Sequence, residues 1–237
     1  MVDLSLILPV HNEATIITDV LADVIRTLKS IRVPFECILV ENGSTDSTLT
    51  VLRQLTKKYS NVYVTIAPKG YGSAVLAGLK NAKGRYVCYM PSDGQIDLNV
   101  FSSLWKSATL NKWDLVKIRR VTRESWDRSA ISTFFSIVVS MLFGIPRWDI
   151  NGSPHIFLRS HLQKLNLESK DSFIDTEFAV KAHLLGWNIK EIPMRTLPRT
   201  GGISTRSWRT FWEFARNLFW FRFYRFPILR KKLRLHR

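Results

Sequence analysis

The N-terminal half of the chain alternates short apolar runs with segments of helical period, and this alternation narrows the folds open to it. Four apolar runs predict strands at 4–10, 35–40, 62–67 and 86–90. Helices are expected between them, from Asn12 to about Ile31, from a cap at Ser44 or Thr45 to about Tyr59, and after Gly70 to Ala82. Strands joined by helices pair in parallel, so we expect an α/β fold with a mostly parallel, doubly wound sheet.

The second half of the chain is less regular. We expect strands at 115–118, 155–158 and 189–192, and a helix at 175–185 with Gly186 as its C-cap. The segment 130–143 is strongly apolar, but it is short of the ~20 residues that a membrane-spanning helix needs. We therefore expect a buried or interfacial helix there.

The fourth predicted strand stops at an acid, a glycine and an amide, in the run YVCYMPSDGQ at 86–95. Open α/β sheets bind ligands at the carboxyl ends of their strands. Asp93 and Gln95 are two residues apart, so a short turn can direct both toward one hard cation such as Mg²⁺ or Mn²⁺. Such a cation would hold the diphosphate of a nucleotide. An ordinary turn at a strand end is the alternative interpretation.

A chain of 237 residues, 46% of them apolar, can bury a sizeable core in one large domain, with or without an appendage. Cys37 and Cys88 lie in predicted strands, which favours buried free thiols. With no signal peptide evident, this indicates a reducing compartment. The formal charge is +16, and residues 199–237 supply +10 of it, with eleven Lys and Arg against Glu213. This asymmetry indicates an anionic partner, which is either a membrane surface or nucleic acid.

Aromatic and basic residues are interleaved near the C-terminus. Ten of the nineteen residues 208–226 are aromatic, and Arg209, Arg216, Arg222 and Arg225 lie among them. An amphipathic segment of this composition is typical of the headgroup level of a bilayer. The alternative is a helix packed on the domain with solvated arginines. Nucleic acid is not expected as a partner, because the basic tail lies outside any recognisable reader motif.

Seven strings, in this order, resemble glycosyltransferase family 2, and within it the polyprenyl-phosphate mannose and glucose synthases. They are LILPVHNE (6–13), VENGSTDST (40–48), KGYGSAVLAGL (69–79), PSDGQ (91–95), DINGSP (149–154), DTEF (175–178) and RTGGIS (199–204). The resemblance covers about residues 4–205. It implies a Rossmann-like GT-A catalytic domain at 1–205, which leaves 206–237 as an amphipathic, aromatic and basic membrane-associating helical tail.

The resemblance also implies a nucleotide-sugar site at the ends of the first four strands. Its expected members are Pro9, Asn12, Glu13, Glu41, Lys69, Gly70, Ser92 and Asp93. Glu41 suits this place because a carboxylate accepts hydrogen bonds from ribose hydroxyls or a pyrimidine N–H. The backbone around Gly70 and Gly72 can approach a ligand closely because glycine has no side chain. Asp93 and Gln95 match the positions at which the family binds its metal.

The chain departs from the family pattern at three places. Pro91 stands where the family usually has the first acid of Asp-x-Asp-Gly-Gln. Glu41-Asn42 replaces the usual Asp-Asp, and Thr205 replaces the usual Lys, with Arg206 beside it. The loss of the first acid puts donor affinity in question, although Mg²⁺ can rely on few protein ligands and on substrate phosphates.

A polyprenyl phosphate acceptor would bring its own anionic oxygen, so the site would need cations rather than a strong base. Arg119, Arg128 and Arg199 are the expected acceptor-phosphate ligands, with Ser132 as a hydrogen-bond donor. The expected catalytic residues are Asp93, Arg199 and Glu177. A hydroxyl acceptor would need a carboxylate base. Asp149 or Glu177 could then serve, although a structural role in its turn is favoured for Asp149.

The leading hypothesis is an inverting, metal-dependent transferase. It would move a hexose from a GDP- or UDP-sugar to a polyprenyl phosphate, as a peripheral protein on the cytosolic face of a membrane. A homo-oligomer or a membrane partner could compensate for the lack of a spanning helix. A second hypothesis is the same fold acting on a saccharide or glycolipid hydroxyl for surface polysaccharide. A third, motivated by Pro91, is a catalytically weakened scaffold that binds a membrane or a partner enzyme.

Overall fold

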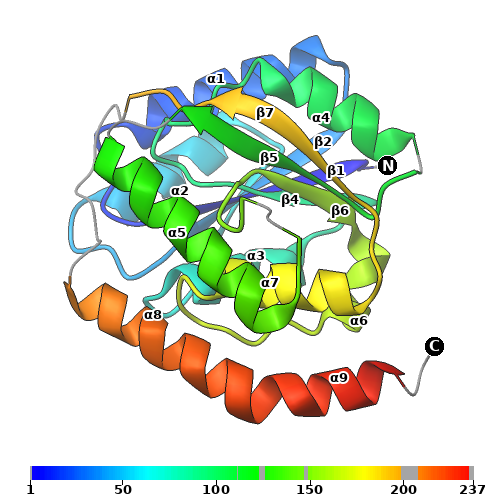
Figure 1. Ribbon diagram of the computed structural model, residues 1–237. Coiled ribbons are helices and arrows are strands. Elements are labelled where there is room, and N and C mark those ends of the chain that lie inside the picture. The colour runs from blue at the N-terminus through cyan, green and yellow to red at the C-terminus, as the bar shows by residue number, and fades with distance from the viewer. Residues whose placement is uncertain (1, 111, 123–125, 147–148, 199–207, 235–237) are drawn as a thin grey trace.

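The computed structural model describes residues 2–110, 112–122, 126–146, 149–198 and 208–234, and of residues 122, 126–132, 208–211, 213 and 232–234 it describes the backbone alone (Figure 1). Its strands are β1 (Leu4–Val10), β2 (Phe35–Glu41), β3 (Val62–Ile66), β4 (Tyr86–Tyr89), β5 (Leu115–Thr122), β6 (His155–Leu158) and β7 (Ile189–Arg195). Its α-helices are α1 (Ile17–Ser30), α2 (Thr48–Lys58), α3 (Tyr71–Asn81), α4 (Val100–Thr109), α5 (Trp126–Phe143), α6 (Leu162–Leu165), α7 (Ile174–Leu184), α8 (Trp208–Trp220) and α9 (Phe226–Arg234). A 3-10 turn at Arg159–His161 precedes α6, and a π-helical turn at Phe221–Arg225 joins α8 to α9.

The strands form one sheet in the order β3-β2-β1-β4-β6-β5-β7. The β1–β2, β1–β4, β2–β3 and β5–β7 pairs are parallel, and β6 is antiparallel to both β4 and β5. The expected mostly parallel α/β sheet is therefore confirmed. The chain runs outward from β1 to β3 and returns to β4 on the other side of β1. Open α/β sheets bind ligands at the carboxyl ends of the strands at such a switch point.

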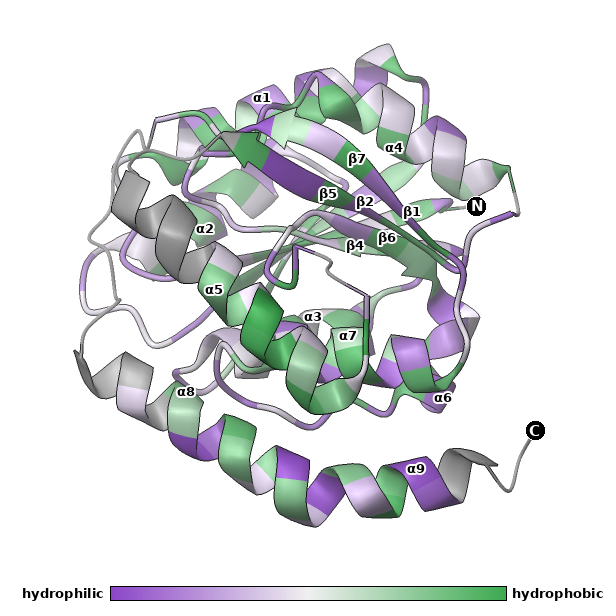
Figure 2. Cartoon of the chain, viewed as in Figure 1, coloured by the Kyte–Doolittle hydropathy of each residue, from purple (hydrophilic) through white to green (hydrophobic). Residues whose placement is uncertain are grey.

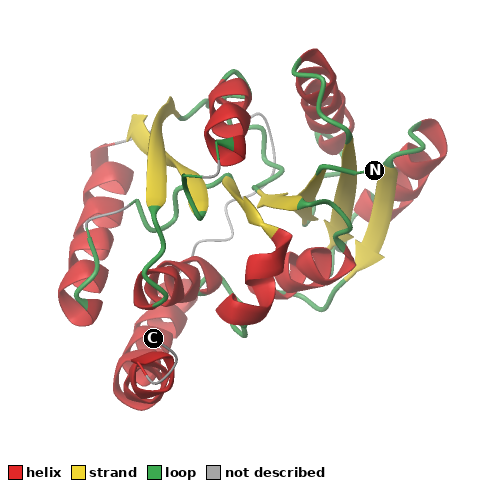
Figure 3. Cartoon of the chain, turned by 90° about the vertical axis from the view of Figure 1, so that its right-hand side faces the viewer, coloured by secondary structure: helices red, strands yellow, loops and turns green. Residues whose placement is uncertain are grey.

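Helices cover both faces of the sheet, as the turned view in Figure 3 shows. On one face α1, α2 and α4 pack against side chains of β1 such as Leu6 and Leu8. On the other face α3 and α7 pack against Ile7, Val87 and Tyr89. Every residue of β1 is buried, as expected for a central strand covered on both faces. Cys37 and Cys88 are buried free thiols in these cores, as predicted.

A third core cluster joins α5 and α7 to the C-terminal helices. The ring of Phe143 on α5 packs edge-on against Phe221 and Phe226, with centroids 5.8 and 5.1 Å apart. Phe135 and Phe214 make a similar pair at 4.6 Å. One side of the predicted tail is therefore core, and the helices lie along the domain in Figure 1. Among the described residues, no helix is long and apolar enough to cross a membrane.

Two helices begin later than predicted. The expectation of a helix from Asn12 is wrong, since α1 starts at Ile17 and Asn12 has a left-handed backbone with φ 53°. Likewise α2 starts at Thr48, where Asp46 accepts a hydrogen bond from the Thr48 backbone N–H at 3.0 Å. In both cases a polar side chain after a strand accepts from a backbone N–H, Asn12 from the loop after β2 and Asp46 from the residue two positions further along the chain.

We predict that Phe143→Ala will lower the free energy of unfolding by about 3–5 kcal/mol, since the truncation leaves a cavity between α5 and the C-terminal helices. Phe134→Ala is the matched control, because Phe134 lies on the same helix but is 68% exposed. Urea unfolding followed by circular dichroism gives both values. Equal losses in the two variants would contradict the packing of the C-terminal helices on α5.

Candidate functional site

The loops after β1 and β2 are joined by hydrogen bonds through their polar residues. The Asn12 backbone N–H donates to Ser44 Oγ at 3.1 Å, and Asn12 Oδ1 accepts from the Thr45 backbone N–H at 2.7 Å. The Glu13 backbone N–H donates to Thr48 Oγ1 at 3.0 Å. Asn12 thus fixes the shape of this edge through backbone contacts.

Three residues predicted to belong to one nucleotide-sugar site lie together where β1 and β4 end. They are Pro9, Glu13 and Ser92. Ser92 Oγ lies 2.6 Å from the Pro9 carbonyl oxygen and also contacts the Glu13 carboxylate. Ser92 is buried, so these contacts lie beneath the surface where the two strands end. Ser92 lies about eighty positions after Pro9 and Glu13 in the sequence, and β1–β4 pairing brings the two segments together.

Glu41 and Asn42 end β2 beside this group, and both are buried. Glu41 Oε1 accepts from the Ser44 backbone N–H at 2.5 Å. Asn42 Oδ1 accepts from the Gly70 backbone N–H at 2.8 Å and so ties the end of β2 to the turn before α3. Lys69 is exposed on that turn.

Gly70 and Gly72 are needed for a close approach that the protein makes to itself. A Cβ on Gly70 would overlap the Lys170 carbonyl oxygen, and one on Gly72 would overlap the Ser169 carbonyl oxygen. The Ser73 backbone N–H also donates to the Lys170 carbonyl at 2.9 Å. The glycines therefore admit the backbone of loop 166–172, where the sequence had suggested that a ligand would approach.

Asp93 and Gln95 lie on the loop after β4, as predicted. Asp93 Oδ1 accepts from the Gln95 backbone N–H at 3.2 Å, and Gly94 takes the positive φ of 75° that this turn requires. The loop is fixed to the segment after β7, because the Leu197 backbone N–H donates to the Gln95 carbonyl at 3.0 Å and Gln95 Nε2 contacts the Leu197 carbonyl at 3.4 Å. Asp93 is 7% exposed. The two oxygen-bearing side chains therefore lie on one short, anchored turn.

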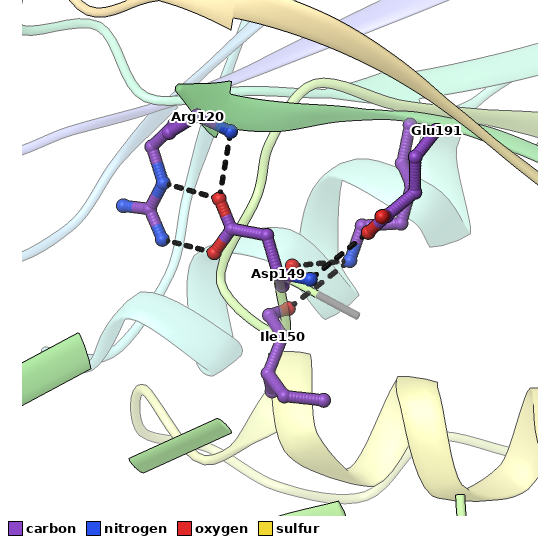
Figure 4. Close-up of polar contacts among 5 residues, drawn as sticks. Arg120, Asp149, Ile150 and Glu191 are labelled. Atoms are coloured by element: carbon purple, nitrogen blue, oxygen red, sulfur yellow. Dashed lines mark hydrogen bonds and ion pairs between the residues drawn. The ribbon is translucent and has the colours of Figure 1, made fainter. Parts of the chain in front are cut away.

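A cluster of charged residues lies under β5 (Figure 4). Arg120 makes a bidentate ion pair with Asp149, in which Nε and Nη2 donate to the carboxylate at 2.8 and 2.6 Å. Burial alone would raise the pKa of Asp149, but the hydrogen bonds and charge of Arg120 outweigh it and lower that pKa to about 2. Lys117 Nζ donates to the Asp149 carbonyl at 2.6 Å, and Glu191 accepts from the Asp149 backbone N–H at 2.9 Å. The structural role favoured for Asp149 agrees with these contacts.

Asp175, at the start of α7, is the group that the sequence analysis missed. Burial raises its pKa to about 6, although the hydrogen bond from Tyr89 and the charge of Lys117 act in the opposite direction. The Tyr89 hydroxyl donates to Asp175 Oδ1 at 3.0 Å. Burial, followed by the charges of Asp175 and Asp93, raises the pKa of the Tyr71 hydroxyl, which places this phenol near both carboxylates. The string DTEF contains both acids, but the sequence suggested a catalytic role only for the second, Glu177.

Glu177 lies apart from this group. Its carboxylate accepts from the backbone N–H groups of Glu168 and Ser169, at 3.1 and 2.8 Å, and pairs with Lys181 at 2.6 Å. Both members of the ion pair are buried. The contacts with Glu168 and Ser169 hold loop 166–172, and the ion pair lies within α7, so these contacts favour a structural role for Glu177.

The expected acceptor ligands are only partly described. Arg119 is exposed on β5, and the neighbouring Arg120 makes the ion pair with Asp149. Arg128 and Ser132 lie on α5, where the backbone alone is described. Arg199 lies outside the described residues.

Residues 5–160 match the sequence profile of glycosyl transferase family 2. The chain belongs to this family. The resemblance inferred from the seven strings is therefore confirmed at the level of the family.

Two relatives of this family 2 chain have names that differ in how specifically they describe an activity. Dolichyl-phosphate beta-glucosyltransferase ALG5A of Trichomonas vaginalis is 27% identical over 216 residues, which cover 81% of this chain but only 64% of that protein. An uncharacterized glycosyltransferase of Mycobacterium bovis, Mb0553, is 30% identical over 206 residues, or 84% of this chain and 88% of that protein. The chain thus spans less than two thirds of the first relative and most of the second.

Solved structures support the fold. Glucosyl-3-phosphoglycerate synthase from Mycobacterium tuberculosis, in complex with Mn²⁺, uridine diphosphate and phosphoglyceric acid, superposes with a TM-score of 0.68 at 18% identity. The match covers 92% of this chain and 76% of that one. The expected GT-A fold is confirmed.

We predict that Lys181→Met will lower the free energy of unfolding by about 3–5 kcal/mol, because it leaves the buried Glu177 carboxylate without its counter-charge. The double variant Glu177→Gln/Lys181→Met should recover part of that loss, since no buried charge then remains uncompensated. Urea unfolding of the two single variants and the double variant measures this. Strictly additive losses would contradict the coupled ion pair. A Glu177→Gln variant that folds fully but loses kcat would support the catalytic role expected of Glu177 from the sequence.

Proposed function

We propose that the chain transfers a hexose from a nucleoside diphosphate sugar to a polyprenyl phosphate. The observation that carries the proposal is the sheet edge at the β1–β4 switch point in a chain of family 2, where Ser92 contacts the Glu13 carboxylate and where the strands that precede Asn42 and Asp93 also end. Glu41 and Asp93 lie at these strand ends. The name of the Trichomonas relative supports a lipid phosphate as acceptor. The exposed aromatic residues of the C-terminal helices are consistent with a lipid substrate.

The donor is proposed to be a UDP- or GDP-hexose. Glu41 would face the base or ribose, and Pro9, Asn12 and Glu13 would line the nucleotide pocket. Lys69 and the backbone at Gly70 would lie toward the phosphates, with Ser92 and Asp93 at the diphosphate. The uridine diphosphate bound by the Mycobacterium tuberculosis protein supports a nucleotide ligand for a chain of this fold.

A divalent cation, Mg²⁺ or Mn²⁺, fits the turn after β4. Asp93 offers a carboxylate and Gln95 an amide oxygen, both hard donors suited to these ions. No group of three His, Cys, Asp or Glu able to hold a metal occurs within the described segments, so donor phosphates would supply further ligands. When bound, the ion neutralises charge that develops on the departing diphosphate. Pro91 leaves the protein's share of the ligands at one carboxylate and one amide.

The reaction would form a bond between the acceptor phosphate oxygen and the anomeric carbon while the bond from that carbon to the diphosphate breaks. The attacking oxygen is already an anion, so the protein's task is to bring two phosphates together. Arg119, Arg128 and Arg199 are proposed to bind the acceptor phosphate, with Ser132 as donor. Guanidinium groups suit this because they donate two parallel hydrogen bonds to phosphate oxygens.

The acceptor lipid sets the proposed location. A polyprenyl phosphate is held in a bilayer, and nucleotide sugars are cytosolic solutes, so we place the chain as a peripheral protein on the cytosolic face. A homo-oligomer or a membrane partner remains part of this proposal. The charge of +16 favours an anionic surface over a neutral one.

A saccharide or glycolipid hydroxyl is the second candidate acceptor, and Asp175 is the observation that favours it. A hydroxyl must lose its proton as it attacks, which calls for a base with a pKa near the working pH. Asp175 has a pKa of about 6. Burial, and then the charges of Asp175 and Asp93, raise the pKa of the Tyr71 hydroxyl, so the two carboxylates lie near the same phenol. The carboxylate of Asp175 would then take the proton.

We predict that Asp93→Asn will weaken metal-dependent donor binding by at least about 10–100-fold, the loss typical even of residues that only support a metal ligand. Isothermal titration of UDP- and GDP-hexoses, with and without Mn²⁺, measures this. Asp97→Asn is the matched control four residues further on, because Asp97 accepts from the Asn99 backbone N–H at the start of α4. Wild-type protein without metal-dependent affinity for any nucleotide sugar would favour the scaffold hypothesis instead.

We predict that Asp175→Asn will lower kcat with polyprenyl phosphate by less than about tenfold, since that acceptor needs no base. With a hydroxyl acceptor, wild-type kcat/KM should rise as the pH rises through about 6, because Asp175 acts only when deprotonated. The variant should then lose about 10²–10⁴-fold. Rate–pH profiles with both acceptor classes distinguish the two candidates. A loss of the larger size with polyprenyl phosphate would contradict a reaction that proceeds without a base.

A further inference from the structure

The C-terminal helices carry apolar side chains on two opposite sides. The inner side belongs to the third core cluster and consists of Phe214, Leu218, Phe221, Phe226 and Leu229. On the outer side, Trp212, Phe219 and Phe223 are 68%, 61% and 56% exposed. A surface helix of a globular protein normally pairs one apolar stripe with a polar one. The outer aromatic residues therefore need an explanation other than the packing of this domain.

Exposed apolar side chains are concentrated on this side of the molecule. Thirteen large hydrophobic residues are exposed in the described part of the chain, and eight of them lie on α5 or on the helices from α8 to α9. The eight are Phe134, Met141, Trp212, Phe219, Trp220, Phe223, Tyr224 and Ile228. The two helical segments pack on each other through Phe135 and Phe214. Such a concentration marks an interaction surface.

The charge on the C-terminal helices is almost entirely positive. Residues 208–234 include eight Lys and Arg and one acid, Glu213. Arg216, Arg230 and Lys231 are exposed. Two further arginines lie over aromatic rings, Arg222 over Phe223 at 5.6 Å and Arg225 over Trp220 at 5.7 Å. Arginine beside Trp and Phe matches the headgroup layer of an anionic bilayer, where apolar rings and cations are both accommodated.

The shape of the surface also favours a bilayer. The segment from α8 to α9 is one continuous helical rod of 27 residues, about 40 Å of helix at the usual rise, and it bends between α8 and α9 (Figure 1). It lies along the outside of the domain, and its helices carry both hydrophobic and hydrophilic residues in Figure 2. A convex rod with aromatic side chains along its outer side suits a plane into which it can sink.

We propose that the outer side of α8–α9, together with the exposed residues of α5, docks onto an anionic lipid bilayer with the rod lying in the headgroup layer. We call this surface the docking face. It names a membrane partner for the proposed transferase, but vesicle binding is measured without any transfer reaction. The two ideas can therefore fail separately.

The packing of the inner side decides how the docking face can be tested. Deleting residues 208–237 would uncover Val139, Phe143 and Phe173, so a truncated chain would report on folding rather than on docking. Substitutions confined to the exposed side chains avoid this. The triple variant Trp212→Ser/Phe219→Ser/Phe223→Ser should keep the thermal unfolding transition of the wild-type chain.

The experiment is flotation of the full chain with vesicles of phosphatidylcholine alone and of phosphatidylcholine mixed with phosphatidylglycerol. We expect the wild-type chain to float with the mixed vesicles and to be released by salt. The triple variant should need at least about tenfold more lipid, because three buried aromatic rings are lost from the interface. Phe134→Ser/Met141→Ser should weaken binding as well. Arg230→Gln/Lys231→Gln should reduce the preference for anionic vesicles by roughly fivefold per charge.

Tyr63→Ser/Leu110→Ser is the matched control, because both side chains are large, apolar and exposed but lie on β3 and at the end of α4. It should float like the wild-type chain. Equal flotation of the triple variant and the wild-type chain would overturn the proposal. So would a wild-type chain that ignores vesicles and elutes as a dimer broken by the triple substitution, since a second copy would then occupy this surface. A chain that floats as expected but transfers no hexose to any lipid phosphate would sink the proposed function alone.

Discussion

The buried ion pair between Glu177 and Lys181 holds the loop on which the arrangement of this molecule depends. The pair fixes residues 166–172 through the backbone N–H groups of Glu168 and Ser169. That loop fills the space beside Gly70 and Gly72. These glycines belong to the turn whose Gly70 N–H donates to the Asn42 side chain at the end of β2. On its other side, Asp171 accepts from Asn217 and Glu168 pairs with Arg225, both on the C-terminal helices. One loop therefore connects the proposed donor edge to the docking face. A buried pair costs desolvation on both partners, so its hydrogen bonds to loop backbone are what make it favourable.

A second set of buried charges lies on the other side of the switch point. Lys117, Arg120 and Asp149 satisfy one another around the chain before β6, and Asp175 borders them with its bond to Tyr89. Antiparallel β6 enters the sheet between β4 and β5, and this insertion carries the Asp149 turn to the sheet edge. The stacked rings of Tyr89 and His155, 4.7 Å apart, join β4 to β6 directly beneath that turn. Carboxylates with opposite pKa shifts, Asp149 at about 2 and Asp175 at about 6, thus arise within one network because only Asp149 has a guanidinium partner.

Local patterns predicted the parallel half of the sheet and the loop after β4, because apolar runs and strand-end acids are properties of neighbouring residues. The position of Gly186 after α7, with φ 71°, follows from the same kind of local rule. The antiparallel direction of β6 was not evident, since four apolar residues carry no sign of which strand they pair with. Asp175 was missed because its burial comes from β4 and β5, far away in sequence. The packing role of Gly70 was not evident for a related reason. A glycine shows that something approaches closely, but only the fold shows that it is the backbone of Lys170.

The C-terminal helices pack on the domain with one side and expose aromatic residues on the other, and this arrangement would orient the donor edge relative to a bilayer. A free amphipathic tail would hold the chain at a bilayer by a flexible tether and leave the orientation of the donor edge undetermined. Packing of Phe143 against Phe221 and Phe226 makes the rod part of the domain, so a plane that contacts its outer side also fixes how the sheet edge is turned. Two reactants held in a defined mutual geometry react faster than two that must find it, because the orientational entropy is lost before the reaction begins. A lipid phosphate restricted to the bilayer surface and a nucleotide sugar held at the β1–β4 edge would meet on these terms. The rigid attachment of the docking face, rather than its affinity alone, is then what the transfer would require of it.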